Sequence, residues 1–448
     1  MRKIIPLLLM LLLICSAVAM AETPAALSDA EWRAQQTAGQ GYYVEGLTQE
    51  EFDALEETTI IKDPGSVTGY TVTFRYKDPD ATRVRIRGEW SFSDAHGITV
   101  DGITYYEPEE WKIGNFAMIP DFQGDWPAYD MVKNEETGVW SYTIPLPSGT
   151  WSYRFYIGGV EGAELKDYTD AVQTTDPNNR PFEDFVGAQN NSQVRVPFDP
   201  DKQVEDYSLQ LPNPDGKDGT GEIVYYNMPD DGTAYQLFVY LPYGYDAGRE
   251  EPYNVLYISH GSGVESETSW YNKGSVAYML DNLIAQGRVE PFVLVSINNY
   301  AVAETLGKYD VDNLINNIMP YVEANYNVSS QPEGRAVAGL SRGGRFTMET
   351  ILTYPDEVGY YGLFSAGMPD NFDLTTDLDV EALADSRIFV GYGEQELCDP
   401  ERCAARLEML SNLTAQGQFY DWKLFPGGHQ WTVWRQNFVD FCEMTLWK

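Results

Sequence analysis

The sequence predicts two folded domains of different classes, an antiparallel β-sandwich followed by an α/β domain built on a mostly parallel sheet. Apolar and polar residues alternate with period two in runs between residues 69 and 186, which is typical of half-buried strands. Short apolar strands alternate with helical stretches from about residue 221 onward, a pattern typical of a parallel sheet covered on both faces. Between the two patterns, residues 187–220 are rich in Asp, Asn, Pro and Gly, which predicts a linker.

Length and composition limit the class of protein. A length of 448 residues corresponds to a prior of about three domains. The 30 Lys and Arg residues stand against 68 Asp and Glu residues, so the formal net charge is −38. This acidity argues against nucleic acids and anionic membrane surfaces as partners, because both are bound by clustered Lys and Arg. The four cysteines exclude a disulfide-framework mini-protein and a cysteine-rich zinc protein.

The first residues predict a targeting signal. Arg2 and Lys3 precede an apolar run over residues 4–19, and small residues follow, which is the pattern of a secretory signal peptide cleaved after Ala21. A membrane anchor is the first alternative, but the run is shorter than the ~20 residues that a spanning helix needs. A lipoprotein signal modified at Cys15 is the second. We therefore expect a secreted protein, extracellular or periplasmic, with no membrane contact after cleavage.

Residues 22–60 are polar and predict an N-terminal arm that packs on another part of the chain. Two short helical signatures stand out in it, Ser28 with Glu31 and Thr48 with Glu51. A Ser or Thr followed three residues later by Glu is the capping-box pattern of a helix start.

The sandwich domain is predicted over residues 61–186. Its alternating runs include residues 70–74, 83–87, 140–144 and 151–157, separated by Gly and Pro turns such as 147–149. Together with the stretch 176–179, the segments 84–88, 138–141 and 147–155 resemble carbohydrate-binding module family 48, an early-set immunoglobulin-like domain often attached to glucan and xylan enzymes. An aromatic-rich insertion with Trp90, Trp111 and Trp126 is longer than expected of that family. These tryptophans could bind sugar rings or form core, and we favour packing.

The α/β domain is predicted over residues 221–448. We expect strands at 237–241, 255–259, 293–297, 336–340, 362–366, 388–391 and 422–425. The expected helices are 276–285, 311–325, 345–354, 400–415 and 433–445.

A G-x-S-x-G motif formed by Gly339, Ser341 and Gly343 lies between a predicted strand and a predicted helix. This is the context of a nucleophile elbow, in which a strained turn presents the serine hydroxyl above the carboxyl edge of the sheet. Side chains at positions 339 and 343 would collide with neighbouring backbone. Ser341 is therefore the candidate nucleophile.

A serine nucleophile needs a base, and the sequence has only three histidines. His429 follows the last predicted strand and satisfies the chain order Ser, acid, His, so it is the candidate base. His260 follows an early strand and is expected to be structural, in a loop whose Gly261 and Ser262 amides would form an oxyanion hole with the Arg342 amide. His96 is expected to face solvent in a loop of the sandwich insertion.

The acid is expected after the strand at 388–391, where Glu394, Glu396 and Asp399 lie close together. By position we prefer Glu396, with Asp399 as the alternative. A Cys398–Cys403 or Cys398–Cys442 disulfide would hold this loop, if the cysteines pair at all.

These motifs carry a second resemblance. The segments 255–261, 281–284, 339–344 and 427–435, together with Trp270, resemble carbohydrate esterase family 1, which has the α/β-hydrolase fold and includes feruloyl and acetylxylan esterases. The resemblance implies the roles already named for Ser341, His429 and the oxyanion-hole amides. That family usually has Asp where Glu396 stands and often Met where Arg342 stands.

Together, the two resemblances imply a secreted serine esterase that removes feruloyl groups from arabinoxylan through an acyl-enzyme, without metal or cofactor. Its partner would be a feruloylated or acetylated plant polysaccharide. Acetylxylan esterase is the alternative, and a non-catalytic glycan-binding protein on the same fold is a further one. Trp270, Trp431 and Trp434 flank the catalytic loops and could stack on a flat acyl group, although tryptophans here are also ordinary core.

Overall fold

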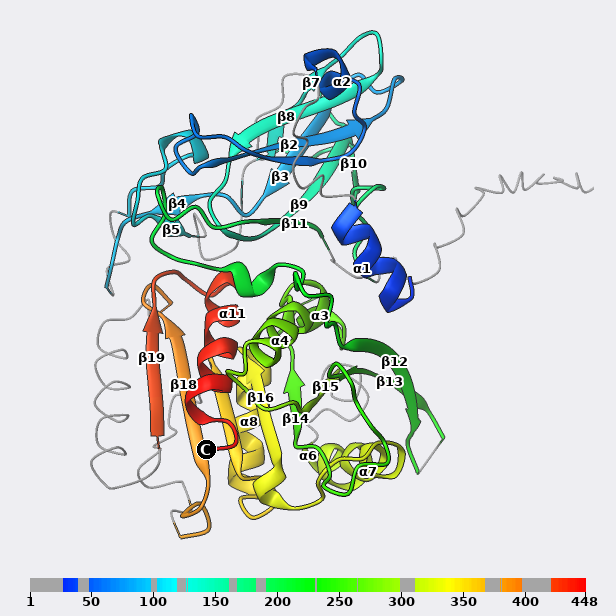
Figure 1. The fold of residues 1–448 in the computed structure, drawn as a ribbon, viewed down its shortest axis with the longest axis vertical. Coiled ribbons are helices and arrows are strands. Elements are labelled where there is room, and N and C mark those ends of the chain that lie inside the picture. Colours follow the sequence, from blue (N-terminus) through cyan, green and yellow to red (C-terminus); the bar gives the residue numbers. More distant parts are fainter. Residues whose placement is uncertain are drawn as a thin grey trace, which may run out of the picture.

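The computed structural model describes residues 27–38, 48–97, 103–118, 126, 128–160, 167–182, 191–229, 232–263, 265–298, 311–366, 379, 381–396 and 420–448. The predicted signal peptide and the predicted helix at 400–415 lie outside these ranges. Figure 1 shows two parts, an N-terminal β domain and a C-terminal α/β domain, with the β domain on the side toward which the arrowhead of strand β19 (Tyr420–Phe425) points.

The N-terminal domain consists of two antiparallel sheets around one apolar core. One sheet has the strand order β1-β2-β8-β7, and the other has the order β10-β9-β3-β6, with β11 also paired to β9. The strands are β1 (Thr59–Lys62), β2 (Tyr70–Lys77), β3 (Val84–Gly88), β6 (Ala128–Asp130), β7 (Val132–Lys133), β8 (Val139–Pro145), β9 (Gly149–Gly158), β10 (Ala171–Thr174) and β11 (Ser192–Val196). Val72, Phe74, Ile86 and Phe155 are fully buried in this core, as the period-two pattern predicts.

An insertion between β3 and β6 forms a small ribbon. Strands β4 (Phe92–Ser93) and β5 (Phe116–Ala117) pair antiparallel, and the short helix η1 (Pro108–Glu110) lies between them in the chain. Trp90 and Trp111 are buried in the sandwich core, so their role is packing.

The C-terminal domain contains an eight-stranded sheet in the order β12-β13-β15-β14-β16-β17-β18-β19. The strands β12 (Thr220–Asn227) and β13 (Ala234–Leu241) are antiparallel to their neighbours, and all pairs from β15 to β19 are parallel. The remaining strands are β14 (Val255–Ser259), β15 (Val293–Ile297), β16 (Arg335–Leu340), β17 (Tyr360–Phe364) and β18 (Arg387–Gly393). Strands β14 and β15 have the predicted bounds, and the other predicted strands differ by at most three residues at an end.

Helices cover both faces of this sheet, and each face has its own apolar core. The helices are α3 (Ser269–Asn272), α4 (Val276–Ala285), α6 (Val311–Asn313), η3 (Leu314–Ile318), α7 (Met319–Asn325), η4 (Pro332–Gly334), α8 (Arg342–Thr353), α11 (Trp431–Asp440) and η5 (Phe441–Thr445). Side chains of α6, η3, α7 and α8 pack into one core, and those of α3, α4, α11 and η5 pack into the other. The predicted helix at 311–325 contains a central π-helical segment, η3.

The segment predicted as a linker is a packed connector. It carries β11, which pairs with β9 and extends the sandwich to Val196, and the short helix η2 (Ser208–Gln210). The Asn282 side chain donates hydrogen bonds to the carbonyls of Leu209 and Leu211. The composition of the segment is that of a linker, but its backbone forms hydrogen bonds with both domains, from Tyr207 N to Ser148 Oγ and from Gly219 N to Asp281 Oδ1.

The first helix of the predicted N-terminal arm docks on the C-terminal domain. Helix α1 (Asp29–Ala38) inserts Trp32 into the core of α3, α4 and α11. Arg33 forms ion pairs with Asp29 at 3.1 Å and with the buried Asp281 at 2.8 Å. Both predicted capping boxes are present, at Ser28 and at Thr48, where helix α2 (Gln49–Asp53) begins.

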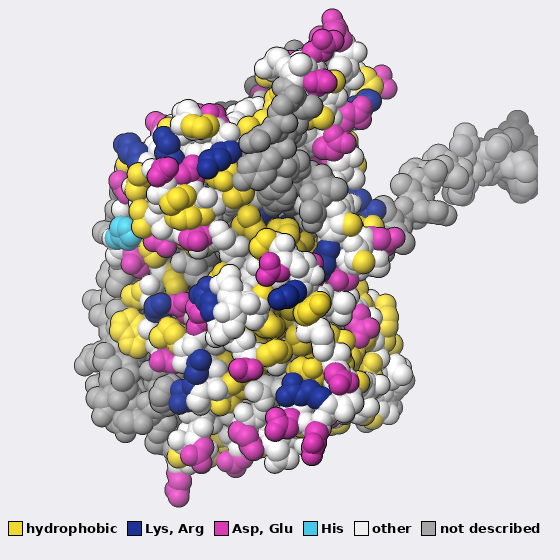
Figure 2. Space-filling model, viewed as in Figure 1, with side chains coloured by type: hydrophobic (Ala, Val, Ile, Leu, Met, Phe, Trp, Pro, Cys, Tyr) yellow, Lys and Arg dark blue, Asp and Glu magenta, His cyan; other side chains and the backbone are white. Residues whose placement is uncertain are grey.

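Acidic side chains are spread over both domains on the face shown in Figure 2, with Lys and Arg scattered among them. The described part of the chain holds no helix with the length and apolar character needed to cross a bilayer.

Candidate active site

Ser341 lies in a strained turn between β16 and α8. Its backbone has φ 53° and ψ −110°, a conformation that residues with a side chain rarely adopt. The Ser341 amide donates a 2.8 Å hydrogen bond to the carbonyl of Phe364, the last residue of the neighbouring strand β17. The turn is thus fixed to the sheet and leads directly into the first turn of α8.

The glycines of the motif are required by close backbone approach. A Cβ atom on Gly339 would lie 2.5 Å from the carbonyl oxygen of Gly343, and one on Gly343 would lie 2.5 Å from that of Ser259. A Cβ atom on Gly344 would lie 2.7 Å from that of Ala366. These contacts bear out the sequence-based reason for glycine at 339 and 343, and add Gly344.

The structure brings together three of the predicted residues. His429 Nε2 lies 2.9 Å from Ser341 Oγ, and His429 Nδ1 lies 3.1 Å from Glu396 Oε2. Because a carboxylate can only accept, Nδ1 carries the proton, which leaves Nε2 to accept the hydrogen of the Ser341 hydroxyl. This relay can withdraw a proton from the serine.

The topology explains why residues so far apart in sequence meet. Ser341, Ser365, Glu396 and His429 follow the carboxyl ends of β16, β17, β18 and β19, which are four successive strands of the sheet. The carboxyl ends of parallel strands share one edge, where α/β proteins bind ligands.

Sequence reasoning missed Ser365, which holds Glu396 in place. The indole Nε1 of Trp434 donates to Ser365 Oγ at 2.8 Å, and the Ser365 hydroxyl donates to Glu396 Oε1 at 2.6 Å. The Gly393 amide donates to the same carboxylate oxygen at 2.8 Å. Ser365 also has a positive φ of 48°. In the sequence, the only signal for Ser365 is a serine at the end of a predicted strand. This pattern is too common to identify a functional residue.

The neighbouring carboxylates of this loop differ in their contacts. Glu394 accepts a hydrogen bond from the Gly97 amide of the sandwich insertion, at 2.8 Å. Asp399, the alternative acid, lies outside the described residues.

The predicted oxyanion loop lies beside the elbow. A Cβ atom on Gly261 would lie 3.4 Å from Ser341 Cβ, so this backbone runs alongside the nucleophile. Ser262 follows it and is exposed. Arg342 is the first residue of α8, and amides of a first helical turn point toward the N-terminal end, where negative charge is favoured.

The other two histidines lie away from this relay. His260 is fully buried, with Nδ1 2.9 Å from the carbonyl oxygen of Gly261 and Nε2 3.2 Å from Asn298 Oδ1. These acceptors favour the charged ring, but burial has the larger effect and lowers the pKa of His260. The His96 side chain is 60% exposed, as expected, and lies 3.4 Å from Glu394.

The three tryptophans predicted to stack on substrate form core instead. Trp270 is 0% exposed, and Trp431 and Trp434 are 6% and 7% exposed. Trp431 packs edge-on against both other rings, at 5.2 Å between ring centroids in each case. Trp434 packs edge-on against the imidazole of His429 at 5.0 Å. The substrate-stacking prediction is therefore wrong for this cluster. Its contact with the catalytic loops is the packing of Trp434 against the imidazole of His429.

The predicted Cys398–Cys442 disulfide is also wrong, because Cys442 is a buried free thiol. Cys398 and Cys403 lie outside the described residues. Among the residues that the structure describes, no group of three or more His, Cys, Asp or Glu side chains could hold a metal ion.

Comparisons with known proteins find a matching family model and several relatives. Residues 231–443 match a family described as putative esterase. An endo-1,4-beta-xylanase/feruloyl esterase of Xylanibacter ruminicola is 29% identical over 320 residues, which cover 68% of this chain and 40% of that protein. An endo-1,4-beta-xylanase Y of Acetivibrio thermocellus is 32% identical over 122 residues, 26% of this chain and 11% of that protein. The chain therefore spans less than half the length of these curated relatives.

Among solved structures, an enterobactin esterase of Shigella flexneri is similar with a TM-score of 0.53 at 15% identity, over 88% of this chain and 98% of that one. This likeness concerns the fold alone, and it confirms the predicted fold class, antiparallel β-sheets followed by an α/β-hydrolase domain. Residues 231–443, which match the family described as putative esterase, thus lie in a domain that has the α/β-hydrolase fold.

Proposed function

We propose that the chain is a serine carboxylic-ester hydrolase in which Ser341 is the nucleophile, His429 the base and Glu396 the acid. The observation that carries this proposal is the relay at the elbow, with 2.9 Å between Ser341 Oγ and His429 Nε2 and 3.1 Å between His429 Nδ1 and Glu396. Both distances fall within hydrogen-bond reach, which is the geometric requirement for an activated serine.

The reaction takes two steps. His429 Nε2 takes the hydroxyl proton while Ser341 Oγ attacks the ester carbonyl, and the C=O electron pair moves onto the oxygen. The tetrahedral intermediate collapses, the C–O bond to the alcohol breaks, and the imidazolium returns its proton to the leaving oxygen. Water then attacks the acyl-enzyme with His429 again as base, which releases the acid and restores the serine.

The backbone amides of Gly261, Ser262 and Arg342 supply the proposed oxyanion hole. Support for this comes from the closeness of Gly261 to Ser341 and from the position of Arg342 at the start of α8. Loss of one such donor typically costs about 3–4 kcal/mol in the transition state.

For the substrate we propose a feruloyl group on arabinoxylan. The printed name of the Xylanibacter ruminicola relative includes feruloyl esterase, and it supports this class over other esters. The resemblance of the sandwich to carbohydrate-binding module family 48 agrees with a polysaccharide substrate. A secretory signal in residues 1–21 would export the enzyme to such a substrate. Acetylated xylan is the alternative.

The test is an ester panel on wild type, Ser341→Ala and Ser330→Ala, in which Ser330 is an exposed serine of the same domain. We expect wild type and Ser330→Ala to release ferulate from methyl ferulate and from feruloylated arabinoxylan, and Ser341→Ala to release none. Acetate release from acetylated xylan without ferulate release would shift the assignment to acetylxylan esterase. No turnover of any ester, nitrophenyl acetate included, would contradict the esterase proposal and favour a glycan-binding protein.

A further inference from the structure

We propose that the sandwich insertion, defined as residues 89–97 and 103–118, holds the catalytic loops in register, with Gln395 as the positioning residue. The proposal rests on the proposed function, because it concerns the loops that carry Glu396 and His429. Its observation is separate: the β4–β5 ribbon lies next to the ends of β18 and β19 (Figure 1) and forms hydrogen bonds with both loops.

Gln395 joins three segments of the chain. Its side-chain Oε1 accepts the Gly427 amide at 2.7 Å, and its Nε2 donates to the carbonyls of Ala95 at 2.6 Å and Gly97 at 3.1 Å. Gln395 is 4% exposed, so these bonds are shielded from water. One side chain therefore ties the insertion to the base loop from a position next to Glu396.

A second set of contacts runs parallel to the first. The Gln430 side chain donates to the Ala117 carbonyl at 2.8 Å, and Met118 packs beside Gly428, so residues on both sides of His429 touch the insertion. On the acid side, the Gly97 amide donates to Glu394 at 2.8 Å. The insertion thus contacts both neighbours of His429 and, on the acid side, Glu394 and Gln395, the two residues that precede Glu396.

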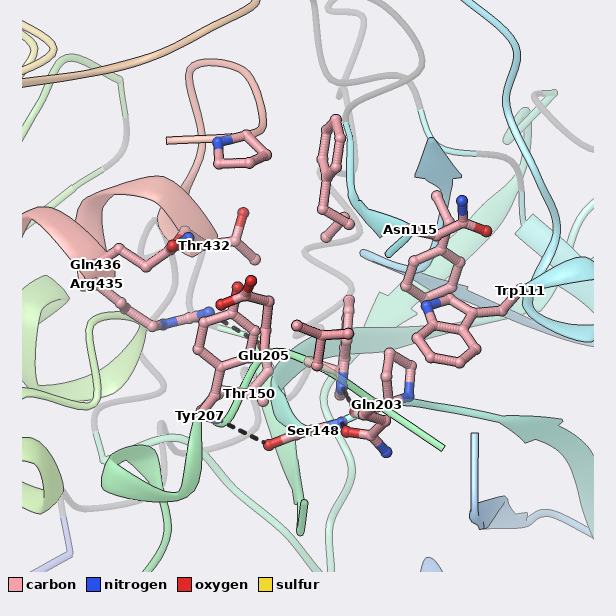
Figure 3. A pocket seen from close by; sticks show the side chains of 18 of the residues that line it. Trp111, Asn115, Ser148, Thr150, Gln203, Glu205, Tyr207, Thr432, Arg435 and Gln436 are labelled. Atoms are coloured by element: carbon pink, nitrogen blue, oxygen red, sulfur yellow. Dashed lines mark hydrogen bonds between the residues drawn. The ribbon is translucent and has the colours of Figure 1, made fainter. Parts of the chain in front are cut away.

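The adjacent interface is not closely packed. Figure 3 shows a cavity between α11, the insertion and the connector, with Trp111 and Asn115 on one side, Arg435 and Gln436 on the other, and Glu205 between them. The cavity volume is about 50 Å³. Apolar packing is therefore interrupted at this part of the interface, where the individual hydrogen bonds contribute to the position of the insertion.

The acid and base loops also contact each other through the backbone. Glu394 N donates to the Phe425 carbonyl at 2.8 Å, and Gln395 N donates to that of Gly427 at 3.1 Å. A displacement of about 1 Å between catalytic groups can reduce the rate about 100-fold. Loosening the insertion should therefore act on the rate rather than on substrate binding.

The first test compares Gln395→Leu with Gln203→Leu in the full chain. Gln203 is a matched buried glutamine, 6% exposed, that accepts the Ser148 amide and donates to the Thr68 carbonyl without touching the catalytic loops. For a small soluble aryl ester, we expect Gln395→Leu to lower kcat about 10- to 100-fold with KM within about threefold. Gln203→Leu should keep the wild-type kcat, whatever its melting temperature.

The second variant, Gly97→Pro, breaks the contact from the sandwich side, because it removes an N–H donor at a residue whose φ is 87°. If both residues act through one contact, their effects should not add. The double variant Gln395→Leu/Gly97→Pro should then have a kcat less than about threefold below that of the more impaired single variant.

Hydrogen exchange provides a readout that needs no turnover. Exchange of the Gly427 amide should accelerate in Gln395→Leu and in Gly97→Pro but not in Gln203→Leu. If the wild type has no esterase activity, the proposed function is wrong. The exchange of the Gly427 amide still tests whether the insertion holds the loops. Unchanged exchange at Gly427, or a kcat of Gln395→Leu within about twofold of Gln203→Leu, would overturn it.

Discussion

Replacing Glu396 by glutamine tests whether this carboxylate sets the protonation of His429. Oε1 of Glu396 already accepts two hydrogen bonds, from the Ser365 hydroxyl at 2.6 Å and the Gly393 amide at 2.8 Å. The Gly393 amide can only donate, so the atom at the Oε1 position must be an acceptor. A glutamine at 396 must therefore place its amide oxygen at Oε1 and its NH₂ group at Oε2, facing His429.

This orientation inverts the relay. The NH₂ group would donate to His429 Nδ1, which forces the imidazole proton onto Nε2, the atom that must accept the proton of Ser341. The corresponding change in a Ser-His-Asp triad lowers kcat about 10⁴-fold. We expect a loss of the same order, equivalent to about 5.4 kcal/mol in the activation free energy, with KM nearly unchanged.

The assay measures kcat and KM on a soluble aryl ester at pH 7 for wild type, Glu396→Gln and Asp399→Asn, with circular dichroism as the check on folding. Asp399→Asn, on the other candidate acid, should keep activity close to wild type. A loss smaller than about tenfold in Glu396→Gln, or a larger loss in Asp399→Asn, would refute the assignment of the acid.

Three further changes test the surroundings. Gly343→Ala places a Cβ atom 2.5 Å from the Ser259 carbonyl, so urea unfolding should show a loss of about 1–3 kcal/mol; an unchanged midpoint would mean that the elbow relaxes freely. Ser365→Ala removes one donor to Glu396 and should lower kcat about tenfold, or about 1.4 kcal/mol; steady-state kinetics at wild-type levels would contradict its positioning role. His260→Gln should flatten the acid side of the stability profile, measured as unfolding free energy against pH.

The sign of the last prediction follows from proton linkage. Burial lowers the pKa of His260 below 6.5, so the unfolded chain binds more protons once the pH falls through 6.5. The stability contributed by neutral His260 is complete above pH 6.5. As the pH falls from 6.5 to the lower pKa of the folded state, this stability is lost at up to about 1.4 kcal/mol per pH unit. His96→Gln, on the exposed histidine, serves as control. If the unfolding free energy of His260→Gln falls more steeply toward low pH than that of wild type, the two carbonyl acceptors raise the pKa of His260 more than burial lowers it.

Local patterns predicted much of the fold. The strands β14 and β15 and the helix α4 have the expected bounds, because each is a short apolar run between clear turn signals. The linker prediction failed for β11, because its composition does not reveal a pairing partner on β9, more than thirty residues earlier in the chain.

Predictions about side-chain surroundings were less accurate for a physical reason. Trp270 lies in a motif that flanks the catalytic loops, but sequence proximity to a site does not tell which way a ring points. It donates its indole proton to the Ser259 carbonyl and has no exposed surface. The tertiary packing decided between core and contact surface.

By itself, the sequence determined the candidates for nucleophile and base, Ser341 and His429. The glycines around Ser341 predict a tight turn in which larger residues would collide with the backbone. The order of the apolar strands places His429 after the last strand. The sequence preferred Glu396 by position, but only the tertiary structure shows that its carboxylate faces His429 while that of Glu394 faces the Gly97 amide. The tertiary structure alone revealed Gln395 as the contact to Ala95, 300 residues away, since a hydrogen bond depends on where two atoms meet and leaves no periodic trace along the chain.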